Sequence, residues 1–224
     1  MLKETIAEKQ VRAKKIIELL SAEYPDAKCS LDFGTPHQLM VTTILAAQCT
    51  DERVNQVTPE LFKKYPDVYA FAEASYSELQ EMIKSTGFFR NKTISIIESA
   101  RQIVAEHGGE VPATMEELTS LTGVGRKTAN LILGVAYGQS AVIVDTHVKR
   151  ISFRLGLTEN IDPGKIENDL REILPAEHST NFNHLLVYHG RAVCKAPKPK
   201  CDICLLIGLC PYGQGTLTQN GKDA

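Results

Sequence analysis

The chain has 224 residues, an apolar fraction of 43% and a formal net charge of −2. These values fit one large or two small globular domains, and they exclude a protein that binds nucleic acid through overall positive charge, so any basic surface must be local. The N-terminal MLKETIAEKQ has no signal-peptide core, and no apolar run approaches the ~20 residues of a membrane span. We therefore expect a cytoplasmic protein without membrane contact (nucleoid-associated in a prokaryote), whose six cysteines are thiols or metal ligands.

Helical patterns follow one another along the first half of the chain. Residues 2–24 read as an amphipathic helix that ends at Pro25. Thr35 and Pro36 are a favourable N-cap and first helical residue for a helix that is apolar nearly all round and belongs in the core. Further helices are expected to begin after Asp51 as a cap, at Pro59, after Ser77 as a cap, and beyond a loop at residues 87–92, the last running to His107.

Residues 118–148 read LTSLTGVGRKTANLILGVAYGQSAVIVDTHV and predict a helix, a glycine turn, a second helix and an extended segment ending in an acid. Thr114 and Glu117 have the spacing of a capping box for the first helix. Gly123-Val124-Gly125 breaks it, and residues 126–137 form the second helix, stopped by Gly138. The backbone N–H groups of the turn and of the second helix's first turn predict a seat for a phosphate oxygen.

The remaining third also predicts helices, at residues 146–155, from Asp162-Pro163 to Pro175, and at 180–193. Because no segment alternates with period two for long, the expected fold is all-α.

Four cysteines close the chain with the spacing C-x6-C-x2-C-x5-C: Cys194, Cys201, Cys204 and Cys210. Four thiolates in one turn-rich segment suit either a zinc ion or an iron–sulfur cluster, and chemistry alone does not decide between them. Between the first two lies a basic loop stiffened by two prolines, which suits phosphate contacts. Cys29 and Cys49 fall outside this motif and are expected to be buried apolar residues.

The string L-x-G-V-G-x-K-T-A followed by V-D-T-H-V resembles the helix-hairpin-helix DNA glycosylases of the endonuclease III branch. The resemblance implies a helical barrel domain at residues 25–136, containing the hairpin at about 114–137. It implies a second, iron–sulfur cluster domain built from residues 1–24 and 137–224, with a DNA-binding cleft between the two. The cysteine spacing is similar to that branch's [4Fe–4S] motif at every position.

The resemblance also implies a reaction. The protein would be a monomeric, bifunctional DNA glycosylase and abasic-site lyase of base excision repair, acting on oxidised pyrimidines in duplex DNA. Lys127 would displace the flipped base, form a Schiff base with the sugar and cleave the strand on the 3′ side by β-elimination, with Asp145 as its partner. The positive end of the helix dipole favours the neutral, nucleophilic form of the Lys127 amine.

Further DNA contacts are carried over by position. Gln48 would fill the hole left by the flipped base, and Phe88 stands where the family places an apolar wedge, although leucine is expected there and Phe89 is the competing candidate. The full set of expected DNA-binding residues is Gln48, Phe88, Gly123, Gly125, Arg126, His147, Arg191, Lys195, Lys198 and Lys200.

Other interpretations stay open at this point. Lys127 can be a simple phosphate contact, Asp145 an N-cap and His147 a structural histidine. A monofunctional adenine or mismatch glycosylase is the enzymatic alternative, but it would lack Lys127 and carry an acid in the helix before Gln48, where MVTTILAA has none. A non-catalytic DNA-binding or redox-sensing iron–sulfur module, or a generic zinc-binding helical protein, are the alternatives of other classes.

Overall fold

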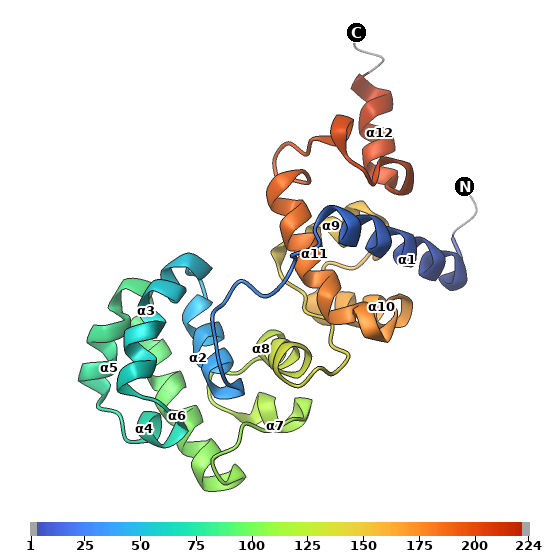
Figure 1. The fold of residues 1–224 in the computed structure, drawn as a ribbon. Coiled ribbons are helices and arrows are strands. Elements are labelled where there is room, and N and C mark those ends of the chain that lie inside the picture. Colours follow the sequence, from blue (N-terminus) through green and yellow to red (C-terminus); the bar gives the residue numbers. More distant parts are fainter. Residues whose placement is uncertain (1–3, 221–224) are drawn as a thin grey trace. The chain divides into compact units, whose positions relative to one another are not determined.

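The computed structural model describes residues 4–220, apart from the side chains of residues 217, 219 and 220. Within that range every regular element is a helix (Figure 1), which confirms the predicted all-α class. No helix of the described chain is long and apolar enough to cross a membrane.

The chain divides into two compact units, Cys29–Gln139 and a discontinuous unit of Met1–Lys28 with Ser140–Ala224. The resemblance predicts domain boundaries after residues 24 and 136, and this division falls after residues 28 and 139. The catalytic candidates Lys127 and Asp145 fall in different units.

The unit at Cys29–Gln139 is built on the apolar helix α2 and the long helix α6, which contributes Ile96, Ile97 and Ile103 to the core. Its helices are α2 (Pro36–Ala46), α3 (Asp51–Lys64), α4 (Val68–Ala72), α5 (Tyr76–Ile83), η1 (Lys84–Thr86), α6 (Phe89–His107), α7 (Met115–Ser120), α8 (Arg126–Leu131) and the π-helical turn η2 (Ile132–Ala136).

The discontinuous unit has its own core, in which Ile16 and Leu20 of the N-terminal helix pack with Leu185 from the last third of the chain. Its helices are α1 (Ile6–Glu23), α9 (Thr146–Arg154), α10 (Pro163–Ile173), η3 (Ala176–His178), α11 (Ser179–Ala192), η4 (Cys201–Ile203), η5 (Ile207–Leu209) and α12 (Pro211–Asn220). Burial of apolar faces from both ends of the chain therefore closes this unit.

Several predicted caps are confirmed. Thr35 caps α2 with Pro36 as its first residue, Asp162 caps α10, and Thr114 caps α7 by accepting a hydrogen bond from the Glu117 N–H at 3.3 Å. The Glu117 carboxylate accepts from the Thr114 hydroxyl at 2.6 Å instead of from the Thr114 N–H, so only half of the predicted capping box forms.

Other predicted boundaries are wrong. α1 begins at Ile6 because Thr5 forms a capping box with Glu8. Thr50 caps α3 in place of Asp51, since its side chain accepts from the Arg53 N–H at 3.2 Å, and α5 follows Ser75 instead of Ser77.

Pro59 does not open a helix but lies inside α3. It is on the exposed face, where water can satisfy the carbonyl that a proline nitrogen leaves without a donor. α12 was missed because PYGQGTLTQN holds two glycines and no apolar face at helical spacing.

Candidate active site

The predicted hairpin forms between α7 and α8. Gly123 takes the left-handed φ of +80° that the turn requires, and Val124 is buried beneath it. Two contacts fasten the turn to α6: the Thr122 N–H donates to the Gln102 side-chain oxygen at 2.8 Å, and Gly123 lies against Ser95. The turn is thus held by the core helix of its own unit.

Lys127 is the second residue of α8 and is exposed. The N-cap of α8 is Gly125, which has no side chain to accept from the first N–H groups of the helix. Such groups attract an anion, and they place the Lys127 amine at the positive end of the helix.

Asp145 caps α9, as its structural interpretation predicted. Its Oδ1 accepts a hydrogen bond from the Val148 N–H at 2.7 Å, and its side chain is half-buried. Its charge also reaches two histidines of the same unit: burial lowers the pKa of His147 and of His184, and the Asp145 carboxylate opposes that shift in both.

His147 is half-buried and held on two sides. An Arg150 guanidinium nitrogen lies 3.2 Å from its Nδ1, and Gly190 packs so closely that an added Cβ would be 2.3 Å from the same atom. Because a guanidinium only donates, Nδ1 must accept, which assigns a neutral ring with its proton on Nε2. Burial and the positive charges of Arg150 and Arg191 keep its pKa low, apart from the opposing Asp145.

Gln48 and Phe88 share an unusual backbone. They are the two non-glycine residues of the described chain with positive φ, +54° and +48°. Such conformations cost roughly 1–3 kcal/mol each and concentrate at functional sites. Gln48 is exposed after α2. Phe88 is 62% exposed as a whole residue, whereas Phe89 is half-buried, so Phe88 is the one that faces solvent.

The four C-terminal cysteines line one pocket that is partly open to solvent. Apolar Ile151, Leu155 and Leu206 form part of its wall. Burial raises the pKa of the Cys201, Cys204 and Cys210 thiols, and neighbouring thiolates add to the effect. Among residues 4–220, no three Cys, His, Asp or Glu side chains stand together as a ready site for a single metal ion.

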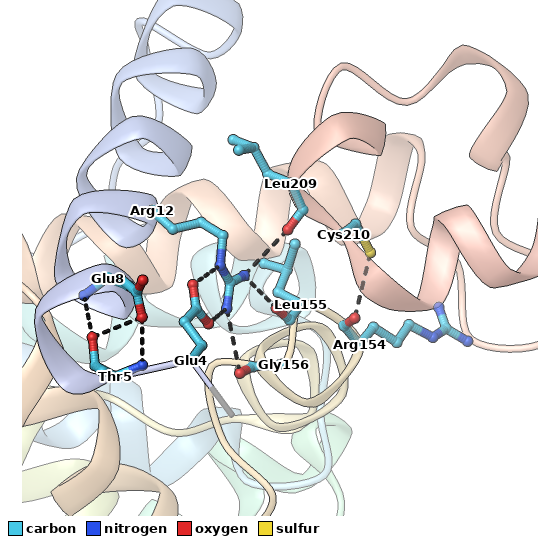
Figure 2. Close-up of polar contacts among 9 residues, drawn as sticks. All are labelled: Glu4, Thr5, Glu8, Arg12, Arg154, Leu155, Gly156, Leu209 and Cys210. Atoms are coloured by element: carbon cyan, nitrogen blue, oxygen red, sulfur yellow. Dashed lines mark hydrogen bonds and ion pairs between the residues drawn. The ribbon is translucent and has the colours of Figure 1, made fainter. Parts of the chain in front are cut away.

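Two arginines brace this cysteine segment. Arg154 donates to the Cys194 Sγ at 3.3 Å and to the carbonyls of Lys195 and Ala196 at 2.8 and 2.7 Å. Figure 2 shows Arg12 of α1 pairing with Glu4 and donating to the carbonyls of Leu155 and Leu209, the latter next to Cys210. Cys29 and Cys49, predicted to be buried, are half-buried, because each lies in a connection outside the helices.

The basic loop of residues 195–200 is closed at its base, where the N–H groups of Lys195 and Lys200 both donate to the Val193 carbonyl, at 2.9 and 3.1 Å. Lys195, Lys198, Lys200 and Arg191 are exposed. The sequence pattern does not predict the bracing roles of Arg12 and Arg154 or the contact of Arg150 with His147. Other basic residues stand beside these arginines in α1 and α9, so nothing local sets them apart.

The chain was compared with known proteins. Residues 41–176 match the model of the HhH-GPD superfamily base excision DNA repair proteins. Endonuclease III of Synechocystis is 55% identical over 94% of this chain and 97% of its own. The structure of a non-covalent Endonuclease III–DNA complex has a TM-score of 0.87 at 35% identity, covering 97% of this chain and 100% of that one. That of a trapped Endonuclease III–DNA covalent intermediate gives 0.86 at 36% identity, over 97% and 100%.

The hairpin seen in the structure lies inside the matched segment, and the likeness extends over both units. The chain therefore belongs to the endonuclease III family of the HhH-GPD superfamily and is a base excision DNA repair enzyme.

Proposed function

We propose that this protein removes oxidised pyrimidines from duplex DNA and then cleaves the strand at the abasic site, with Lys127 as the nucleophile. The observation that carries the proposal is the place of Lys127, exposed in the first turn of α8 directly behind the Gly123–Gly125 turn. A relative trapped in a covalent intermediate with DNA supports a covalent route.

In the proposed reaction the Lys127 amine attacks C1′ of the sugar, and the bond to the damaged base breaks with the electron pair leaving on the base. The nitrogen then passes one proton to Asp145, the C1′–O4′ bond breaks with its electron pair and a proton going to O4′, and the nitrogen lone pair forms the C=N bond of a protonated Schiff base. This imine acidifies the C2′ proton, whose removal expels the 3′ phosphate by β-elimination. Asp145 serves as proton acceptor and stabilises the positive charge that develops on the sugar.

The proposed DNA contacts divide by chemistry. One group would hold phosphates: the Gly123–Gly125 turn, Arg126, His147, Arg191, Lys195, Lys198 and Lys200. The neutral His147 ring would donate its Nε2–H to a phosphate oxygen. Gln48 and Phe88 would enter the base stack, a role that their exposure and strained backbone support.

We further propose that Cys194, Cys201, Cys204 and Cys210 hold a [4Fe–4S] cluster. Three features fit four thiolate ligands. The cysteines line one pocket with an apolar wall. Arg154 donates to the Cys194 Sγ, and the Gly213 N–H donates to the Cys210 Sγ at 3.4 Å. When bound, the cluster supplies cross-linking of a segment that has little regular structure. With four protein ligands it leaves no open position for substrate.

Borohydride trapping tests the nucleophile. A duplex with one oxidised thymine should give a covalent protein–DNA adduct that disappears in Lys127→Ala, while DNA binding by the variant stays measurable. A persistent adduct in that variant would refute Lys127 as the nucleophile.

Metal analysis tests the cluster. Iron and sulfide should each approach four per protein and should fall in Cys204→Ser. Stoichiometric zinc in protein prepared without oxygen would refute the cluster.

A further inference from the structure

Lys92 is a buried lysine for which the proposed reaction has no use. It lies on the core face of α6 beside Thr93 and one turn before Ile96, and it is 4% exposed. Lysine is almost never buried to this degree unless its ammonium has partners. The sequence pattern predicts Lys92 in a loop, whereas it lies in α6, one helical turn before the core residue Ile96.

The partners of Lys92 come from two other elements. Its Nζ donates to the Leu45 carbonyl and to the Thr86 carbonyl, each at 2.8 Å. Leu45 is in the last turn of α2 and Thr86 is the final residue of η1. Carbonyls at helix C-termini lack intrahelical donors and carry partial negative charge, so one ammonium satisfies two helix ends at once.

The segments that follow these two carbonyls carry the two strained residues. Gln48 is three residues beyond Leu45, and Phe88 is two residues beyond Thr86, after Gly87 with φ +70°. Burial lowers the pKa of Lys92 and the Cys49 sulfur opposes this, so the segment after Gln48 also lies near the ammonium. The Lys92 head group is thus the shared anchor of both segments.

The geometry points to Lys92 as a positioning residue that fixes Gln48 and Phe88 relative to each other, so that both side chains enter a damaged duplex together. The inference rests on the proposed DNA-contacting roles of Gln48 and Phe88. It assigns Lys92 no contact with substrate: it acts through the two helix ends that it joins.

A double-mutant cycle tests this role. Lys92→Met keeps much of the side-chain volume and removes both hydrogen bonds, and single-turnover excision of an oxidised thymine from a duplex should fall roughly 10- to 100-fold, as expected for a displaced contact. In a Gln48→Ala, Phe88→Ala background the same change should cost less than about twofold, because its targets are gone. An equal loss in both backgrounds would overturn the positioning role.

Further readouts separate positioning from folding. For Lys92→Met we compare two rates with those of the parent: excision from a duplex, and trapping on a single-stranded abasic substrate, which has no base stack to enter. The fold-loss in trapping should be at least about ten times smaller than the fold-loss in duplex excision. Equal losses would overturn the proposal. Ser99→Ala, which removes another buried hydrogen bond of α6, is the matched control and should leave duplex excision unchanged. If Lys92→Met does not fold, Lys92→Gln replaces it in the cycle. Its side chain is one atom shorter and cannot place donors at both carbonyls, so excision should again fall in the parent and change less than about twofold in the Gln48→Ala, Phe88→Ala background.

The same variants distinguish a failure of the proposed Gln48 and Phe88 contacts from a failure of the positioning role of Lys92. If the Gln48→Ala, Phe88→Ala variant excises as fast as the parent, the proposed stack contacts fail, and the role of Lys92 is overturned with them. If both changes slow excision but Lys92→Met does not, the stack contacts stand and only the positioning role fails.

Discussion

Gly123 of the hairpin lies against Ser95 of α6 so closely that a Cβ added to the glycine would stand 2.4 Å from both the Cβ and the Oγ of the serine. This approach, together with the φ of +80°, leaves room at the turn for glycine alone. The contact joins the proposed phosphate seat to the core helix that also carries Lys92.

Gly123→Ala should therefore lower the free energy of unfolding by about 1–3 kcal/mol, since the alanine strains the backbone and displaces α6. In a chain of this size each kcal/mol shifts the melting temperature by roughly 2–4 °C. Gly125→Ala is the matched control for stability, because no atom lies within 4 Å of its added Cβ and its φ is −94°. Equal melting temperatures for the two variants would contradict the contact.

Asp145 combines a structural and a proposed chemical role, and two substitutions separate them. Asp145→Asn keeps a good N-cap for α9, so thermal stability should stay near that of the parent, whereas Asp145→Ala should lose about 1 kcal/mol. Both remove the carboxylate and should slow the lyase step by roughly 10²- to 10⁴-fold. Chemical denaturation and single-turnover cleavage measure the two effects, and an active Asp145→Asn variant would leave Asp145 as a cap only.

Features that short sequence patterns encode could be predicted. Thr35-Pro36, Asp162-Pro163 and the Gly123–Gly125 turn each specify their conformation through residues a few positions apart, and the structure has them as predicted. Asp145 as an N-cap belongs to the same class, because a cap needs only the three residues that follow it.

Contacts that depend on distant segments could not be predicted. The anchoring of Leu45 and Thr86 by Lys92, and of the cysteine segment by Arg154, joins residues that only tertiary packing brings together. At two places local residue preferences argued against helix that the structure contains. Pro59 predicts a helix boundary but lies inside α3, and the glycines of residues 211–220 predict no helix where α12 forms. The positive φ of Gln48 and Phe88 had no local signal either, as neither residue favours that region.

His37 should make the stability of the Cys29–Gln139 unit depend on pH. It is buried against Phe71, with ring centroids 5.2 Å apart, and its Nε2 has no hydrogen-bond partner in the described chain. Burial lowers its pKa from 6.5 to about 4, against an opposing effect of Asp67. The unfolded chain therefore takes up a proton below pH 6.5 while the folded chain stays neutral to about pH 4, so stability falls as the pH falls through that window.

His37 should contribute up to about 1.4 kcal/mol per pH unit to the slope. His37→Phe, which keeps the ring packing, should remove that share and leave the share of the other histidines whose pKa burial lowers, namely His147, His184 and His189. Urea denaturation between pH 4 and 7 measures this. His178→Gln, at an exposed position, is the control and should keep the parent's slope. A His37→Phe variant with the parent's pH dependence would exclude His37 as the cause.

The basic loop should govern the salt dependence of DNA binding. Lys195, Lys198 and Lys200 are exposed on a segment whose ends are tied to the Val193 carbonyl, so their charges are presented on a fixed backbone. Replacing all three by alanine should reduce the slope of log K against log salt by about 0.9 for each phosphate that the loop no longer neutralises, and should weaken binding to undamaged and damaged duplexes alike. Fluorescence anisotropy from low to moderate salt measures the slope.

Charge itself is controlled by a second triple variant, in which Lys14, Lys15 and Lys165 of α1 and α10 become alanine; these are exposed lysines of the same unit, outside the loop. Its slope should match the parent's, since counterions are released only where lysine and phosphate meet. Iron content should be the same in both triple variants, because neither removes a thiol. Equal slopes for the loop variant and the parent would show that the loop lysines solvate the surface without touching DNA.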